Sequence, residues 1–167
     1  GSARHGHSAA LCTGLALRAR RRRRRLARAG PRKPVSGAGA LAFHISDWVD
    51  ERFKLPVEDL PEFKESLSPD ENAQALRAYW RLGEKPISNL INLMEAKGVR
   101  VFSLSENTKA VDAFSMWRRN TPYVFLNTTK TAERSRFDAA HELGHLIMHK
   151  YSAPQGRRAE EEANQFA

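Results

Sequence analysis

The chain has 167 residues, the length of one ordinary domain with room for an appendage. Its 28 lysines and arginines against 19 aspartates and glutamates give a formal net charge of +9, but this excess is local. Residues 1–40 contain 11 basic and no acidic residues, which leaves residues 41–167 with 17 basic and 19 acidic ones. A domain that coats nucleic acid is therefore not expected. We predict a disordered Arg-rich tail in 1–40 and one folded domain in 41–167.

A single cysteine, Cys12, rules out an intrachain disulfide and a zinc cluster built from cysteines. No apolar run approaches the roughly 20 residues that cross a bilayer. Six arginines at 20–25 follow a mildly apolar stretch, which is the reverse of the order in a secretory signal peptide, although an acid-free, Arg-rich start also resembles an organelle transit peptide. We expect a cytoplasmic protein without membrane contact, whose only route to nucleic acid is the tail.

Apolar periodicity and turn residues predict three helices in the first half of the domain. Their ranges are about 46–55, 70–83 and 86–98. Ser46 or Asp47 is the expected cap of the first helix. Gly83 and Gly98 are the expected ends of the other two, because glycine readily ends a helix.

Three short segments rich in β-branched and aromatic residues then predict strands, at 99–104, 111–117 and 123–126. We expect them to form a small antiparallel sheet. Ser135 and Asp138 resemble a capping box, which predicts a helix from about Arg136 to Lys150. A last helix begins near Arg157. Helices followed by strands and then by two helices indicate an α+β fold.

The helix predicted over 136–150 carries the sequence His141-Glu142-Leu-Gly-His145. Residues four apart lie on one face of a helix, so the two imidazoles can bind one metal ion. Glu142 lies on the flank of that face, where it can take a proton from a catalytic water without being a ligand. Apolar residues beside the motif favour a buried metal site. The alternative is a half-exposed helix whose histidines only form hydrogen bonds.

A catalytic zinc needs a third protein ligand. His149 lies about 12 Å along the helix from His141, too far to share its ion. The last helix offers the three glutamates 160–162, of which Glu160 and Glu162 flank its apolar face from opposite sides. Periodicity does not separate these two. Glutamates near a helix start can also simply stabilise the helix dipole on a solvated face.

At this point the sequence resembles a known family. The motifs are His-Glu-Leu-Gly-His-Leu-Ile-Met-His at 141–149 and Glu-x-x-Ala-Asn-x-Phe-Ala at 160–167, with Leu-Arg-x-x-Trp-x-Leu-Gly-x-x-Pro-Ile upstream at 76–87. Together they resemble the ImmA/IrrE family of metallopeptidases. The resemblance extends over about residues 45–167.

The resemblance implies a zincin-like fold, with Zn²⁺ held by His141, His145 and Glu160 and with Glu142 as the general base. It also implies an endopeptidase that cleaves a helix-turn-helix transcriptional repressor. Two departures from the family pattern stand out. Residues 1–40 contain no recognisable helix-turn-helix, and the sequence stops inside the last helix, so we expect a domain truncated at its C-terminus.

A second hypothesis is a non-catalytic regulatory module. It would bind a protein or nucleic acid, with the metal structural or absent and the arginine run supplying affinity. Glu142 discriminates between the two hypotheses, because a structural site has no use for a carboxylate in the position of the base. Its presence favours the enzyme.

Overall fold

The computed structural model describes residues 37–64, 66–104, 113–127, 130–151 and 156–167, so the tail predicted for 1–40 lies outside them up to residue 36. The described elements are α1 (Gly37–Asp50), α2 (Pro69–Tyr79), α3 (Leu90–Ala96), β1 (Arg100–Leu104), β2 (Ala113–Arg118), β3 (Thr121–Asn127), α4 (Ala132–Met148) and α5 (Arg157–Phe166). The fold is α+β, as predicted. None of these helices combines the length and the apolar character that crossing a membrane requires.

The sheet is mixed, with strand order β1-β3-β2. β2 pairs with β3 in antiparallel fashion, whereas β1 pairs with the other edge of β3 in parallel. The prediction of an antiparallel sheet is therefore wrong for one of the two pairings. The β2–β3 hairpin is local, because Arg119 and Asn120 adopt the two positive φ angles, 49° and 69°, of a tight hairpin turn. No comparable local signal specifies which edge of the hairpin β1 joins.

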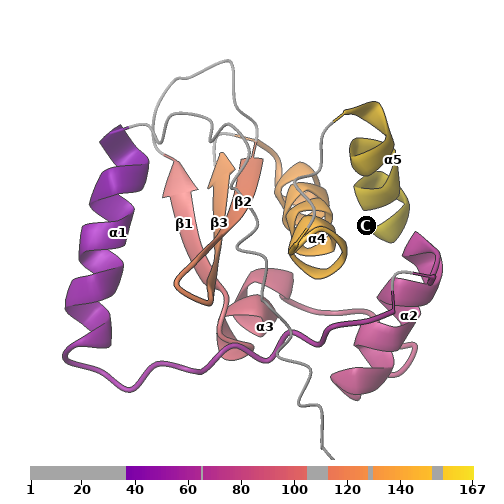
Figure 1. Ribbon diagram of the computed structural model, residues 1–167, viewed down its shortest axis with the longest axis horizontal. Helices are drawn as coiled ribbons and strands as arrows, with labels where there is room; N and C mark the ends of the chain where they lie inside the picture. Colours follow the sequence, from indigo (N-terminus) through magenta and orange to yellow (C-terminus); the bar gives the residue numbers. More distant parts are fainter. Residues whose placement is uncertain (1–36, 65, 105–112, 128–129, 152–155) are drawn as a thin grey trace, which may run out of the picture.

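The central strand β3 is buried on both faces of the sheet. Tyr123 and Phe125 point to one face, where they form an aromatic cluster with Phe43 of α1. Val124 and Leu126 point to the other face, where they pack in the main core with residues of α2, α3, α4 and α5. This alternation follows from the two-residue period of a strand. The sheet therefore lies between α1 and α4, which pack on its opposite faces (Figure 1).

Helix α1 is longer than predicted and begins at Gly37. Ser46 is therefore inside the helix and not at its cap, and its hydroxyl hydrogen-bonds the Tyr123 hydroxyl at 2.9 Å. Asp47 accepts two hydrogen bonds from Arg118 of β2, at 2.6 and 2.8 Å. These contacts fix α1 to the face of the sheet that lies away from α4.

The caps of the next helices differ in part from the predictions. Ser68 caps α2 as part of a capping box, Asn89 caps α3 and Thr131 caps α4. Helix α3 consequently starts four residues after Pro86, and α4 starts before Ser135, which is not its cap. Ser, Thr and Asn all accept hydrogen bonds from the first helical turn, so several candidates compete in a polar segment.

Asp59 anchors the irregular segment that precedes α2. Its carboxylate accepts hydrogen bonds from Tyr79 and Lys97, each at 2.7 Å, and its carbonyl accepts one from the Trp80 indole at 2.9 Å. Trp80 is buried in the core, whereas Tyr79 is 52% exposed. Its hydroxyl makes a polar contact at the surface instead.

Gly98, which ends α3, has no room for a side chain. Its φ is +79°, and an added Cβ would lie 2.5 Å from the backbone nitrogen of Glu58. Gly83 has a similar φ of +61° with nothing within 4 Å of the same position. We expect Gly83→Ala to lower the free energy of unfolding by about 1–2 kcal/mol, the cost of a left-handed alanine. Gly98→Ala should cost ~1–3 kcal/mol more, because the backbone must also move.

Urea unfolding of both variants beside the wild type measures this difference. Equal decreases in the free energy of unfolding for the two alanine variants would contradict this prediction, because the backbone at Glu58 would then move without an energetic penalty.

Candidate metal centre

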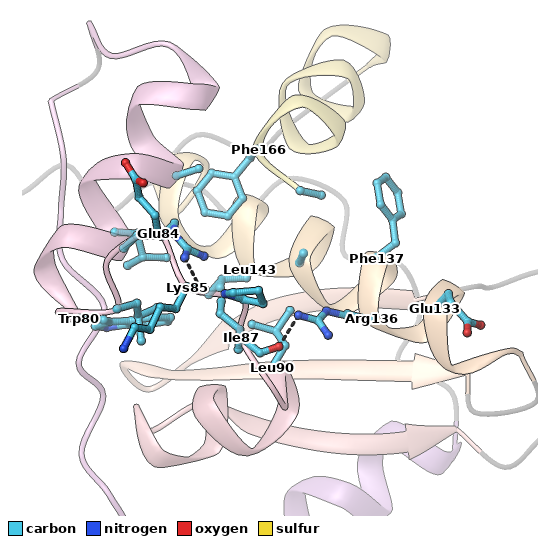
Figure 2. Close-up of a pocket in the computed structure, with 17 residues that line it drawn as sticks. Trp80, Glu84, Lys85, Ile87, Leu90, Glu133, Arg136, Phe137, Leu143 and Phe166 are labelled. Carbon is cyan, nitrogen blue, oxygen red and sulfur yellow. Dashed lines mark hydrogen bonds between the residues drawn. The ribbon is translucent and has the colours of Figure 1, made fainter.

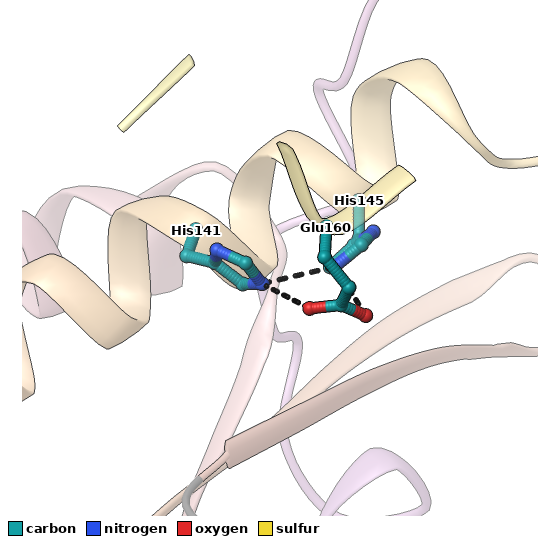
Figure 3. A group of neighbouring side chains, drawn as sticks. All are labelled: His141, His145 and Glu160. Atoms are coloured by element: carbon teal, nitrogen blue, oxygen red, sulfur yellow. Dashed lines mark hydrogen bonds and ion pairs between the residues drawn. The ribbon is translucent and has the colours of Figure 1, made fainter. Parts of the chain in front are cut away.

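The face of α4 that looks toward α5 carries both histidines of the motif. One helical turn separates His141 from His145, and their Nε2 atoms lie 3.0 Å apart, pointing at the same space (Figure 3). Both side chains are largely buried, with 14% and 12% exposed. The two nitrogens thus converge as the spacing of the motif predicts.

Helix α5 brings a carboxylate to the same place. Glu160 Oε2 lies 3.3 Å from His141 Nε2, and its Oε1 lies 3.7 Å from His145 Nε2 (Figure 3). The helices approach closely because α4 has Gly144 at the crossing, where a Cβ would lie 3.0 Å from the Phe166 ring. Ala163 of α5 is completely buried at the same interface.

This donor set fits a zinc ion. The ligand atoms of the three residues lie within 4.8 Å of one another. Tetrahedral bonds of about 2.0 Å place neighbouring ligand atoms about 3.3 Å apart, close to the separations found here. Two imidazoles and one carboxylate form a donor set that catalytic zinc uses, with a fourth position left open. The Glu160 side chain is 65% exposed, which leaves an approach from solvent.

The environment keeps His145 in the protonation state that a ligand requires. Burial, followed by the nearby His141, lowers the pKa of His145 to about 4. The imidazole is therefore neutral near pH 7 and its lone pair is free for a metal.

Glu142 lies on a different flank of α4, against β2. Its side chain is buried, and burial raises its pKa. The hydroxyl of Ser115 on β2 donates a hydrogen bond to the Glu142 carboxylate, which works in the opposite direction. An acid that is partly desolvated and held by one hydrogen bond has the raised pKa that suits a general base.

The other two glutamates of α5 have separate partners. Glu162, which periodicity could not distinguish from Glu160, accepts a hydrogen bond from His149 at 3.0 Å and one from Arg158 at 2.8 Å. These contacts, first that with His149, lower the pKa of Glu162. Glu161 only pairs with Arg157. The structure thus brings Glu160 to the histidine pair, where the resemblance expects it, and brings Glu162 to His149.

Two neighbours of the site received no role in the sequence analysis. Asn164 hydrogen-bonds His141 Nδ1 at 3.0 Å; the available signals were its place in the motif at 160–167 and its spacing of four residues from Glu160. Ser115 could not be found from sequence, because its contact with Glu142 depends on which face of β2 packs against α4. Whether His141, His145 and Glu160 bind a metal stays a prediction.

An apolar cavity of about 700 Å³ borders the same helix (Figure 2). Its walls come from α2, the segment after it, α4 and α5, and include Trp80, Ile87, Leu143 and Phe166. Phe137 lies at the cavity and places its ring centroid 6.4 Å from that of His141. The cavity and the histidine pair are therefore neighbours along α4.

Comparison with known proteins identifies the class. The family model Peptidase_M78, described as the IrrE N-terminal-like domain, matches residues 94–167. This match agrees with the resemblance to ImmA/IrrE metallopeptidases and confirms it over these residues. The resemblance upstream, from about residue 45, stays a prediction. No curated protein and no solved structure matches the chain significantly.

The site predicts a measurable metal content. We expect about one zinc per purified chain, and loss of it in His145→Ala and Glu160→Ala, because each removes one of three protein ligands. Glu161→Ala, which removes a neighbouring carboxylate outside the cluster, should retain the metal. Elemental analysis of these four proteins and of Glu162→Ala measures this. Full zinc in Glu160→Ala together with none in Glu162→Ala would refute the assignment of the third ligand.

Proposed function

We propose that the protein is a zinc-dependent endopeptidase with a zincin-like site. The observation that carries this proposal is the buried carboxyl group of Glu142, which follows His141 on α4 and interacts electrostatically with both His141 and Glu160. A binding module has no need to bury an acid there, and an isolated buried carboxyl group is costly. The metallopeptidase family matched by residues 94–167 supports the same conclusion.

The residues of the site have separate roles in the proposed reaction. His141, His145 and Glu160 would hold the ion, which when bound polarises the scissile carbonyl and lowers the pKa of water. Glu142 accepts the proton of the attacking water at its carboxylate and passes it to the leaving amine. The hydrogen bond from Ser115 limits the rotation of that carboxylate.

The proposed substrate is a protein, and specifically a helix-turn-helix transcriptional repressor in the cytoplasm. The support is the resemblance to ImmA/IrrE proteins, together with the site itself. The cavity beside α4 adds a place for an apolar side chain of that substrate. It is lined largely by apolar groups, with charged side chains such as Arg136 among its walls.

We expect Glu142→Gln to abolish cleavage, by at least about 100-fold, while retaining the metal, because the change removes a base and no ligand. Cleavage of a panel of helix-turn-helix repressors, followed by mass spectrometry, measures the activity, and elemental analysis measures the zinc. Glu161→Gln is the matched control and should cleave like the wild type.

Undiminished cleavage by Glu142→Gln would refute the role of this residue. A zinc-loaded wild type that binds a repressor without cutting it would instead favour the non-catalytic regulatory module.

A further inference from the structure

Both histidines of the centre use their two ring nitrogens in the same way. The Nε2 atoms point at each other and at Glu160, whereas the Nδ1 atoms point outward to other side chains. A neutral imidazole has one N–H and one lone pair. The partner of the outer nitrogen therefore decides whether the inner nitrogen presents a lone pair to a metal.

For His141 the outer partner is an acceptor. Asn164 of α5 places its side-chain oxygen 3.0 Å from His141 Nδ1. An amide oxygen cannot donate, so the proton resides on Nδ1 and the lone pair on Nε2. This is the tautomer that binds a metal through Nε2.

For His145 the same result comes through a second histidine. His149 Nδ1 lies 3.0 Å from His145 Nδ1, and His149 Nε2 lies 3.0 Å from Glu162 Oε2. Arg158 donates to the other oxygen of Glu162, so this carboxylate acts as an acceptor. In the tautomer of His149 that donates from Nε2 to Glu162, Nδ1 is an acceptor, which leaves the proton of His145 on Nδ1.

We propose that α5 fixes the metal-binding tautomer of both histidines, through Asn164 for His141 and through Glu162 and His149 for His145. These three are positioning residues, since none belongs to the cluster of ligand atoms. The inference rests on the metal site of the proposed function. It gives α5 two tasks, because the helix supplies one ligand and orients the other two.

The zinc dissociation constant tests the proposal without any substrate, by competition with a chromophoric chelator at a fixed pH. Removing such an outer hydrogen-bond partner weakens metal binding by about 10- to 100-fold. We expect this loss in Glu162→Ala and not in Glu161→Ala. The two are matched, because each glutamate forms an ion pair at 2.8 Å with the arginine four residues before it.

Two further pairs of variants separate orientation from packing. His149→Leu should weaken zinc binding, whereas His149→Gln should restore most of it, since an amide can accept from His145 and donate to Glu162. Asn164→Leu should likewise weaken binding, while Asn164→Asp keeps the acceptor and the affinity. Urea unfolding in the presence of chelator identifies any variant whose loss comes from an altered fold.

The outcomes distinguish this inference from the proposed function. A wild type that binds zinc, with Glu162→Ala, His149→Leu and Asn164→Leu all within about twofold of it, overturns the inference and leaves the metal centre intact. Equal weakening by Glu161→Ala and Glu162→Ala also overturns it, because a general loss of negative charge would then explain both. No zinc binding by the folded wild type overturns both proposals.

Discussion

The close approach of α4 and α5 is the contact on which the proposed metal centre depends. It is possible because Gly144 has no side chain: a Cβ there would lie only 3.0 Å from the Phe166 ring. A larger residue at either crossing position would push the helices apart. Glu160 would then move away from the histidine pair. The centre is therefore a product of helix packing as much as of the ligand residues, since two ligands come from one helix and the third from the other.

The sheet has a separate task, which is to position Glu142, the proposed base. Ala113, Ser115 and Trp117 alternate along β2 onto the face that packs against α4, and the Trp117 indole donates to the Leu146 carbonyl at 3.3 Å. That contact fixes the register between strand and helix, so that Ser115 meets Glu142. The ligands therefore face one neighbour of α4 and the base faces another.

Much of this arrangement could be predicted from local pattern. The relative position of the two histidines in the motif at 141–145 follows from their spacing within one helix. The start of α5 at Arg157 was also predicted correctly. The parallel pairing of β1 could not be predicted, because it depends on contacts between distant segments and on no local turn. The start of α4 was misplaced because Thr131 and Ser135 are equally good caps by composition. The roles of Asn164 and Ser115 depend on how α5 and β2 pack against α4, and the periodicity of a sequence does not predict that packing.

Helix α5 has only ten residues, and no side chain caps its first turn, which starts at Gly156. A helix this short is marginal in water without tertiary support. Its folding and the occupancy of the centre are therefore linked, because an ion that binds only the docked helix stabilises that state in proportion to the logarithm of its free concentration. Zinc at 100 times its dissociation constant would add about 2.7 kcal/mol. Occupancy of the proposed centre would thereby protect α5 from proteolysis.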